Sequence, residues 1–298
     1  MIADRFLVQA TLGKGAFSKV IRAHDTVAKK DVAIKIDTSQ STSQRAEPLV
    51  SYEARVLQSL HSPQHIPGIP KLLWHGDVPA REKGGNVAMP AIAIELLGRD
   101  LDRVLELNGT LDFPTIATLG VNLLFSIERM HDRGFVHRDI KPANILIGGA
   151  DNRSQIYLAD YGLAKKYLDR SGRHIAYTNT KSGITGTIRY CASHTHENVE
   201  SSRRDDVESL AYVLLYLRNG HLPWQGPPKR TREEIGQIKR SIPTRSLCAN
   251  CPQSFVAFVD LIRQLGFDEK PDYKTLRGLL RASIDESRRG GARDESPP

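Results

Sequence analysis

The sequence predicts an α+β protein in which a small β-rich lobe precedes a larger, mainly helical lobe. Short runs rich in Val, Ile and Ala, which are typical of strands, occupy 6–10, 20–23, 32–36 and 91–97. A helical stretch with apolar residues between 49 and 60 interrupts these runs. Further along, apolar residues recur at three- and four-residue steps over 116–130, and 207–217 is apolar nearly all round. Such patterns indicate buried helices, so we expect the lobes to join near 95–98.

Composition and charge narrow the class of protein. The 298 residues are 40% hydrophobic and 26% charged, which suffices for an ordinary core and excludes a chain disordered throughout. The 42 Lys and Arg residues exceed the 34 Asp and Glu residues and give a net charge of +8. This excess suggests an anionic partner, which could be nucleic acid, a membrane surface, nucleotide phosphates or an acidic protein.

The cysteines and the apolar runs indicate where in the cell the protein is expected. Three cysteines are too few for a secreted disulfide framework, and the pair Cys248 and Cys251 has no second pair to complete four zinc ligands. We therefore expect ordinary reduced thiols. The N-terminus lacks the pattern of a signal peptide, and no apolar stretch approaches the ~20 residues that span a bilayer. We expect a protein of the cytoplasm, the nucleus or both, with no transmembrane segment.

A glycine-containing turn and a lysine mark a possible phosphate site in the first lobe. Gly13 and Gly15 lie between two predicted strands, where glycine lets the backbone approach a polyphosphate closely. Taken alone, this turn fits a plain β-hairpin equally well. Lys35 lies on an otherwise apolar predicted strand, so its ammonium needs a partner, and Glu53 in the helical stretch is the candidate carboxylate.

Polar residues follow the long helix at two loops flanked by predicted strands. The first loop reads HRDIKPAN over 137–144, and the second begins with Asp160 after the strand-like run 156–159. Two carboxylates and an amide in such loops are hard to explain by packing. Together with the glycine turn and the strand lysine, they occur in the order of the protein-kinase signature set.

With these motifs, the chain resembles a eukaryotic-type protein kinase over nearly its whole length, and within kinases it most closely resembles the casein kinase I family. The segments that carry the second likeness read ELLG at 95–98, GLAKKY at 162–167, GTIRY at 186–190, SRRDDVESL at 202–210, LPWQG at 222–226 and KPDY at 270–273. As in that family, the usual Ala-Pro-Glu at the end of the activation segment is absent, and CASHTH occupies 191–196.

The resemblance implies a bilobal protein-kinase fold and a Ser/Thr protein kinase that uses ATP and Mg²⁺. The kinase domain would cover 1–285, with an N-lobe of about 1–97 and a C-lobe of about 98–285, and 286–298 would be a polar, disordered tail.

The resemblance also assigns catalytic roles. Lys35, fixed by Glu53, would hold the α- and β-phosphates. Asp139 would orient the substrate hydroxyl, Lys141 would sit beside the γ-phosphate, and Thr187 would tie the activation segment to them. The Mg²⁺ ligands would be Asn144 and Asp160.

Further residues would contact the nucleotide. By resemblance, the contacts are Gly13, Gly15, Ser18, Val20, Ala33, Lys35, Ile94 at the gatekeeper position, Glu95, Leu97 and Leu146. For the apolar members, simple core packing is an equally good explanation. Three positions depart from the family pattern: Ser18 replaces a third glycine, Tyr161 replaces a phenylalanine and Ala211 replaces a glycine. None of these changes removes a charged catalytic group.

The expected partners are acidic or phosphorylated protein substrates. In the family, residues matching Arg189 and Lys229 help to bind an anion beside the substrate groove, although 229–232 could also be a solvated face. No aromatic stacking platform accompanies the basic residues, so we do not expect nucleic acid as the main partner. Monomer is the default expectation. The alternative function is a nucleotide-binding pseudokinase that acts as a scaffold through its basic surface.

Overall fold

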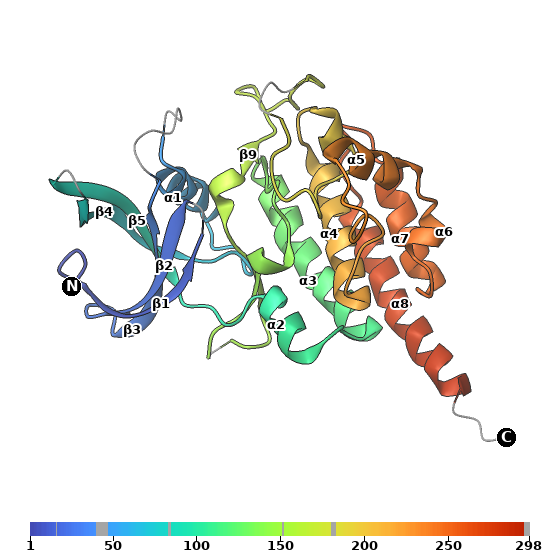
Figure 1. The fold of residues 1–298 in the computed structure, drawn as a ribbon, viewed down its shortest axis with the longest axis horizontal. Helices are drawn as coiled ribbons and strands as arrows, with labels where there is room; N and C mark the ends of the chain where they lie inside the picture. The colour runs from blue at the N-terminus through green and yellow to red at the C-terminus, as the bar shows by residue number, and fades with distance from the viewer. Residues whose placement is uncertain (16, 40–46, 83–84, 151, 180–182, 295–298) are drawn as a thin grey trace. The chain divides into compact units, whose positions relative to one another are not determined.

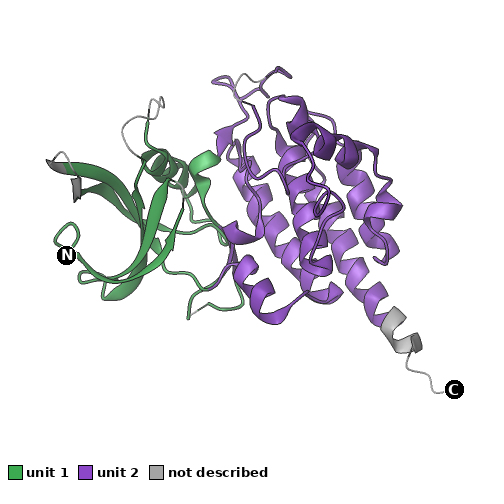
Figure 2. Cartoon of the chain, in the orientation of Figure 1, with its two compact units in different colours: residues 1–98, 147–155, 159–163 green, residues 99–146, 156–158, 164–298 purple. Residues whose placement is uncertain are grey.

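The computed structural model describes residues 1–15, 17–39, 47–82, 85–150, 152–179 and 183–294. The chain forms two compact units, drawn in different colours in Figure 2. Unit 1 comprises 1–98, 147–155 and 159–163, and unit 2 comprises 99–146, 156–158 and 164–298. Two short segments from the middle of the chain therefore belong with the N-terminal unit, one of which carries Asp160.

Unit 1 is built on a five-stranded antiparallel sheet with the order β1-β2-β3-β5-β4 (Figure 1). Its strands are β1 (Phe6–Lys14), β2 (Ser18–Asp25), β3 (Lys30–Asp37), β4 (Leu72–Glu82) and β5 (Gly85–Glu95). The four predicted strands are confirmed, but β4 was missed. Gly76 and Pro79 lie within β4 and break the apolar pattern from which strands are predicted.

The two faces of this sheet differ in their side chains. Because paired residues of antiparallel strands share a face, the register Val20↔Lys35 and Ala33↔Ile94 places these four side chains together. The opposite face forms a hydrophobic cluster of Phe6, Ile21, Ala23, Val32, Ile34, Val78, Ala91 and Ala93. One face therefore holds the sheet together, and the other presents Lys35 with apolar neighbours.

Helix α1 (Leu49–Leu60) completes unit 1 and confirms the predicted helical stretch. It buries an apolar face that includes Val56, Leu57 and Leu60. Glu53 lies on the buried side as well and is 2% exposed. A carboxylate at such a position requires a charged or hydrogen-bonding partner.

Unit 2 is mainly helical (Figure 1). Its helices are α2 (Leu101–Asn108), α3 (Phe113–Asp132), α4 (Arg203–Asn219), α5 (Arg232–Ser241), α6 (Thr244–Leu247), α7 (Gln253–Gln264) and α8 (Tyr273–Asp294). Helices α3 and α4 confirm the two predicted from periodicity. Asp112 accepts a hydrogen bond from the backbone N of Thr115 and so caps α3. In the described parts of the chain, no helix has both the length and the apolar composition to cross a bilayer.

Short elements shape the loops that carry polar residues. Strand β6 (Phe135–Val136) pairs with β9 (Lys165–Lys166), and it leads into the HRDIKPAN loop. That loop ends in a 3₁₀ turn, η1 (Pro142–Asn144), and then enters β7 (Ile145–Ile147). After β8 (Ile156–Leu158), the chain forms a second 3₁₀ turn, η2 (Tyr161–Leu163).

The C-terminal helix differs from the prediction. The sequence placed a disordered tail from 286 onward, whereas α8 continues to Asp294. Glu286 accounts for part of this difference, since its carboxylate accepts hydrogen bonds from the N and Oγ of Ser254, at 3.2 and 2.7 Å. These bonds attach α8 to the start of α7. Residues 295–298 of the predicted tail lie outside the described residues.

The cysteines are free thiols, as predicted. Cys191 and Cys248 are buried, and Cys251 is half-buried. The backbone N of Cys251 donates to the carbonyl of Cys248, so this pair lies in a tight turn.

Candidate active site

The glycine turn joins β1 to β2 in unit 1. The backbone N of Gly15 donates to the carbonyl of Ser18 at 2.8 Å, which closes the turn. Among the described residues, a Cβ on Gly13 would meet nothing within 4 Å, and one on Gly15 would lie 3.6 Å from the Ser18 oxygen. Crowding inside the turn therefore does not require glycine at either position. The bare backbone suits close approach by a ligand.

Lys35 is held by two carboxylates within unit 1. Its Nζ lies 2.7 Å from Glu53 Oε2 and 2.7 Å from Asp160 Oδ1. Burial alone would lower the pKa of Lys35, but the charges of Glu53 and Asp160 outweigh it and raise the pKa. Lys35 is therefore a fixed cation at neutral pH. The structure brings together the lysine and carboxylate that the sequence singled out.

Glu53 also connects helix α1 to the turn that carries Asp160. Its Oε1 accepts a hydrogen bond from the backbone N of Tyr161 at 3.0 Å, and the Tyr161 side chain is fully buried. Asp160 has a φ of +66°, in the left-handed region that aspartate tolerates better than most residues. Its side chain is 45% exposed, so its carboxylate is accessible while one oxygen faces Lys35.

In unit 2, the carboxylate of Asp139 is fixed by several donors. Its Oδ1 accepts from the backbone N of Thr187 at 2.9 Å and from Thr187 Oγ1 at 2.7 Å. Its Oδ2 accepts from Lys141 Nζ at 2.6 Å and from Asn144 Nδ2 at 3.3 Å. Asp139 is 8% exposed, so these contacts set the direction of its carboxylate.

Asn144 is oriented by the same loop. Its Nδ2 also donates to the backbone carbonyl of Asp139 at 2.9 Å. Since the amide nitrogen is used in this way, the side-chain oxygen is the group that Asn144 can offer to a cation. Lys141 completes the cluster by donating to Thr187 Oγ1 at 3.3 Å.

Asp206 of α4 supports the backbone of the loop. Its carboxylate accepts from the backbone N of His137 at 2.7 Å and of Arg138 at 2.9 Å, and from His131 Nε2 at 2.9 Å. Burial would raise the pKa of Asp206, but the hydrogen bond and charge of His131 outweigh it and lower the pKa. Asp206 lies in SRRDDVESL, one of the segments that carry the family likeness, whereas sequence reasoning missed His131, a polar residue next to Met130 at the end of the apolar stripe.

Strain accompanies this loop. Arg138 has a φ of +71°, which is uncommon for a residue with a Cβ. Gly186 has a φ of +91°, and a Cβ there would lie only 2.2 Å from the Arg138 carbonyl oxygen. Only glycine therefore lets the segment before Thr187 pass so close to the loop.

The predicted nucleotide contacts divide between the units. Val20, Ala33 and Ile94 share the sheet face of Lys35 in unit 1, whereas Leu146 belongs to unit 2. Glu95 is tied to Lys71: its N donates to the Lys71 carbonyl at 3.2 Å, and its Oε1 accepts from the Lys71 N at 2.8 Å. These bonds fix the backbone just before Leu97, the last of the predicted contacts in this segment.

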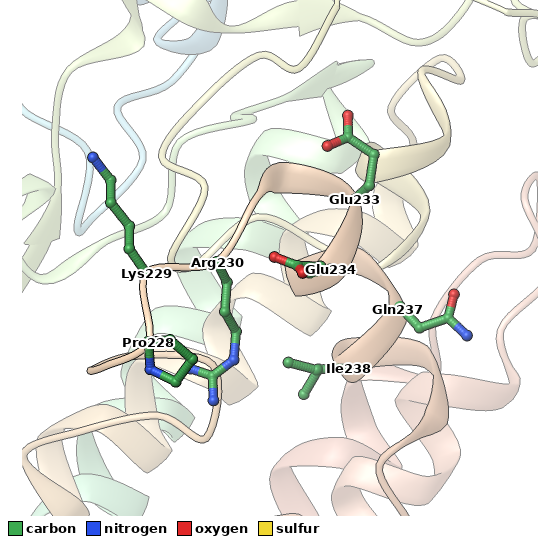
Figure 3. A pocket seen from close by; sticks show the side chains of 7 residues that line it. All are labelled: Pro228, Lys229, Arg230, Glu233, Glu234, Gln237 and Ile238. Atoms are coloured by element: carbon green, nitrogen blue, oxygen red, sulfur yellow. The ribbon is translucent and has the colours of Figure 1, made fainter.

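The two predicted anion ligands have different surroundings in unit 2. The guanidinium of Arg189 lies over the rings of Tyr190 and Tyr216, 5.7 and 5.5 Å from their centroids. Lys229 lines a pocket of about 650 Å³, and Arg189 is not among the lining residues. The pocket is lined by Pro228, Lys229, Arg230, Glu233, Glu234, Gln237 and Ile238 (Figure 3).

Comparison with known families identifies the pattern as a whole. The model of the protein kinase domain family matches residues 6–270 of the chain. The match includes all residues of the Lys35 and Asp139 clusters described above.

Proposed function

The chain belongs to the protein kinase family, and from this premise we propose that it is a Ser/Thr protein kinase of the casein kinase I type. It transfers the γ-phosphate of ATP to Ser or Thr hydroxyls and prefers acidic or already phosphorylated protein substrates. By resemblance to the family, the residues assigned to this reaction are Lys35, Glu53, Asp139, Lys141, Asn144, Asp160 and Thr187.

The observation that carries the proposal is the fixed carboxylate of Asp139. Thr187 binds one of its oxygens, and Lys141 and Asn144 bind the other. A carboxylate held this way can orient a substrate hydroxyl and accept its proton late in phosphoryl transfer. Positioning of this kind is the main task in the reaction, because the protein forms no covalent bond to the phosphoryl group.

The donor set also fits ATP with Mg²⁺, which protein kinase domains bind. Asp160 offers an accessible carboxylate and Asn144 an oriented amide, and oxygens of these two kinds are preferred ligands of Mg²⁺. When bound, the ion neutralises charge on the phosphates. Lys35, a fixed cation between two carboxylates, adds a positive charge for phosphate oxygens.

Ser/Thr specificity and the casein kinase I type rest on sequence features. Lys141, two residues after Asp139, is a feature of Ser/Thr kinases, and its contact with Thr187 Oγ1 is consistent with that role. The net charge of +8, with Arg189 following directly after Thr187 and Ile188, favours a substrate that carries phosphate or carboxylate groups.

A phosphotransfer assay tests the proposal. Wild-type protein is given Mg-ATP labelled at the γ-phosphate together with casein, a serine peptide and the same peptide carrying a priming phosphate. We expect transfer to serine or threonine, faster on the primed peptide, and none above background with Asp139→Asn. If the wild-type protein binds Mg-ATP but transfers no phosphate, the scaffold alternative is supported instead.

A further inference from the structure

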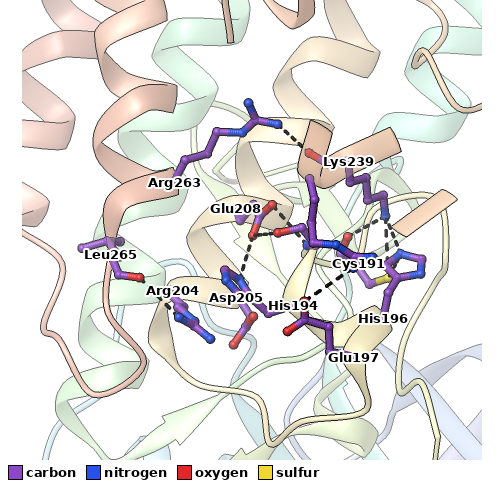
Figure 4. A network of polar contacts seen from close by, with 12 residues as sticks. Cys191, His194, His196, Glu197, Arg204, Asp205, Glu208, Lys239, Arg263 and Leu265 are labelled. Atoms are coloured by element: carbon purple, nitrogen blue, oxygen red, sulfur yellow. Dashed lines mark hydrogen bonds and ion pairs between the residues drawn. The ribbon is translucent and has the colours of Figure 1, made fainter. Parts of the chain in front are cut away.

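A cluster of three potential metal ligands lies in unit 2, outside the residues assigned to phosphoryl transfer. His194, Asp205 and Glu208 each offer one ligand atom, and these atoms lie within 4.8 Å of one another. His194 begins the 3₁₀ turn η3 (His194–Glu197), and the two carboxylates belong to the first two turns of α4 (Figure 4).

The two carboxylates of the cluster are buried, although the charges of Arg204 and Lys239 act on them from nearby. Asp205 is 6% exposed and Glu208 is 5% exposed. Among the described residues, no Lys or Arg forms an ion pair with either of them. The nearby Arg204 donates instead to the carbonyl of Leu265. A buried carboxylate charge is costly unless it is paired or binds a cation.

Two ligand atoms in the cluster also lack a hydrogen bond. In the part of the chain that the structure describes, His194 Nδ1 and Asp205 Oδ1 are buried and unsatisfied. The nearest charged partner of His194 Nδ1 is Glu208 Oε2, at 3.9 Å. Buried polar atoms without partners are rare in proteins, and an ion is one established way to satisfy them.

Surrounding hydrogen bonds hold the carboxylates in place. Asp205 Oδ2 accepts from the backbone N of Ser202 at 2.7 Å. Glu208 Oε1 accepts from Tyr212 OH at 2.5 Å, and both its oxygens accept from Ser193, through N and Oγ. Contacts of this kind orient ligands around bound metals.

We propose that His194, Asp205 and Glu208 bind a divalent transition-metal ion, with Zn²⁺ as the reference member. One imidazole nitrogen and two carboxylate oxygens are zinc donors, with bonds of about 2.0–2.2 Å. Tetrahedral ligands at that range lie roughly 3.4 Å apart. His194 Nδ1 and Glu208 Oε2 are 3.9 Å apart and all three ligand atoms lie within 4.8 Å of one another, so metal binding requires the side chains to close around the ion. The imidazole selects against Mg²⁺ and Ca²⁺, which prefer oxygen ligands.

The site lies close to the surface and would have a structural consequence. The His194 side chain is 30% exposed, although its Nδ1 is buried. Water is the usual fourth ligand where the protein supplies three. The ion would offset the two buried negative charges and join 191–196, the segment in place of Ala-Pro-Glu, to the start of α4. Lys239 already holds this segment by donating to the carbonyls of Ile188 and Cys191, at 2.7 and 2.6 Å.

A zinc-binding measurement on the metal-stripped full chain tests the site. Binding is measured without nucleotide, by equilibrium dialysis against a competing chelator. We expect His194→Asn to weaken Zn²⁺ binding more than tenfold, since even changes next to metal ligands cost about 10–100-fold. His221→Asn replaces an exposed histidine of the same unit and is expected to bind like the wild type. Zn²⁺ should raise the Tm of the wild type but not that of His194→Asn.

Co²⁺ distinguishes this site from the cysteine pair. The expected spectrum shows tetrahedral d–d bands without thiolate charge-transfer absorption, and it persists in Cys251→Ser. Thiolate absorption that disappears in Cys251→Ser would assign the metal to Cys248 and Cys251 and overturn the proposal. Unchanged Zn²⁺ affinity in both His194→Asn and Glu208→Gln, each shown to be folded by circular dichroism, would overturn it as well.

Discussion

At the scale of single residues, Glu53 links three parts of unit 1. Its two oxygens bind Lys35 Nζ and the Tyr161 backbone N, so one buried carboxylate holds the strand lysine and the turn of Asp160. Glu53→Gln keeps the size of the side chain and one acceptor but removes the charge opposite Lys35. We expect kcat/KM for peptide phosphorylation to fall about 10²-fold, as a small misplacement of a phosphate ligand can cost that much.

Steady-state kinetics measure this effect, and Glu47→Gln is the matched control. Glu47 also faces a cation, the exposed Arg55, but on the surface of the unit. Exposed ion pairs contribute little, so Glu47→Gln should leave kcat/KM unchanged. Equal activity of Glu53→Gln and wild type would show that Lys35 is positioned without this carboxylate.

A second residue-scale prediction concerns Gly186. Its φ is +91°, and a Cβ at this position would lie 2.2 Å from the Arg138 oxygen, which excludes any side chain without movement of the loop. Gly186→Ala should therefore destabilise the protein by about 1–3 kcal/mol and reduce activity strongly, because Thr187 and Asp139 are displaced.

Gly172→Ala is the control that separates the backbone cost of a positive φ from the steric clash of the added Cβ. Gly172 also has a positive φ, +78°, but among the described residues a Cβ there meets nothing within 4 Å. It should carry only the backbone cost of about 1 kcal/mol and keep full activity. Calorimetric Tm values and kcat are compared for the two variants. Similar losses in both would show that a steric clash with the Arg138 oxygen is not the cause.

At the scale of elements, Glu286 of α8 caps helix α7, which has no side-chain cap of its own. Glu286→Ala should lower the free energy of unfolding by about 0.5–2 kcal/mol, the usual cost of losing a cap. Asp285→Ala, at a neighbouring position of the same helix, controls for the change in helix propensity. Denaturant unfolding of the two variants measures the difference.

The contribution of Glu286 to the free energy of unfolding should decrease as the pH falls. The hydrogen bonds from Ser254 lower the pKa of Glu286 in the folded protein below its ordinary value of 4.5. A lowered folded pKa adds stability above the unfolded pKa, and this stability is lost as the pH falls through the folded value. The gap between wild type and Glu286→Ala should thus shrink below about pH 4.5. A gap that is constant down to about pH 3 would contradict the role of the charged carboxylate.

The same elements show what the sequence could predict. Apolar runs predicted four strands of unit 1, and the spacing of apolar residues predicted helices α1, α3 and α4. The signal came from residue type as much as from burial, since β1 buries only Phe6. The family match and the structure together confirm the α+β bilobal kinase fold. Strand β4 and the end of α8 were missed, since β4 contains Gly76 and Pro79, and α8 is attached through the distant Ser254.

The candidate site was predictable where residue type and order carry the signal. The charged residues Lys35, Glu53, Asp139 and Asp160 were found in this way. The contact of His131 with Asp206 and the pairing of His194 with Glu208 were not found, because they join residues 75 and 14 positions apart (206 − 131 and 208 − 194). No local pattern encodes such contacts.

At the scale of the whole molecule, the net charge of +8 predicts attraction to anionic substrates, but only local cations can recognise a priming phosphate. Arg189→Ala should reduce kcat/KM for the primed peptide more than for the unprimed one. Lys229→Ala should do the same to a smaller degree, because Glu233 and Glu234 line the pocket beside Lys229 and compete for its charge. Arg281→Ala removes an equal charge from an exposed position on α8 and is the control.

A change in ionic strength separates general attraction by net charge from direct contact with the priming phosphate. General attraction by net charge is screened at about 0.5 M salt, where the Debye length is only about 4–5 Å, whereas a direct contact with phosphate is weakened less. We therefore expect the primed-to-unprimed ratio of the wild type to persist in salt and that of Arg189→Ala to approach the value for an unprimed substrate. If Arg281→Ala lowers the ratio as much as Arg189→Ala, the preference arises from overall charge and the predicted anion site is wrong.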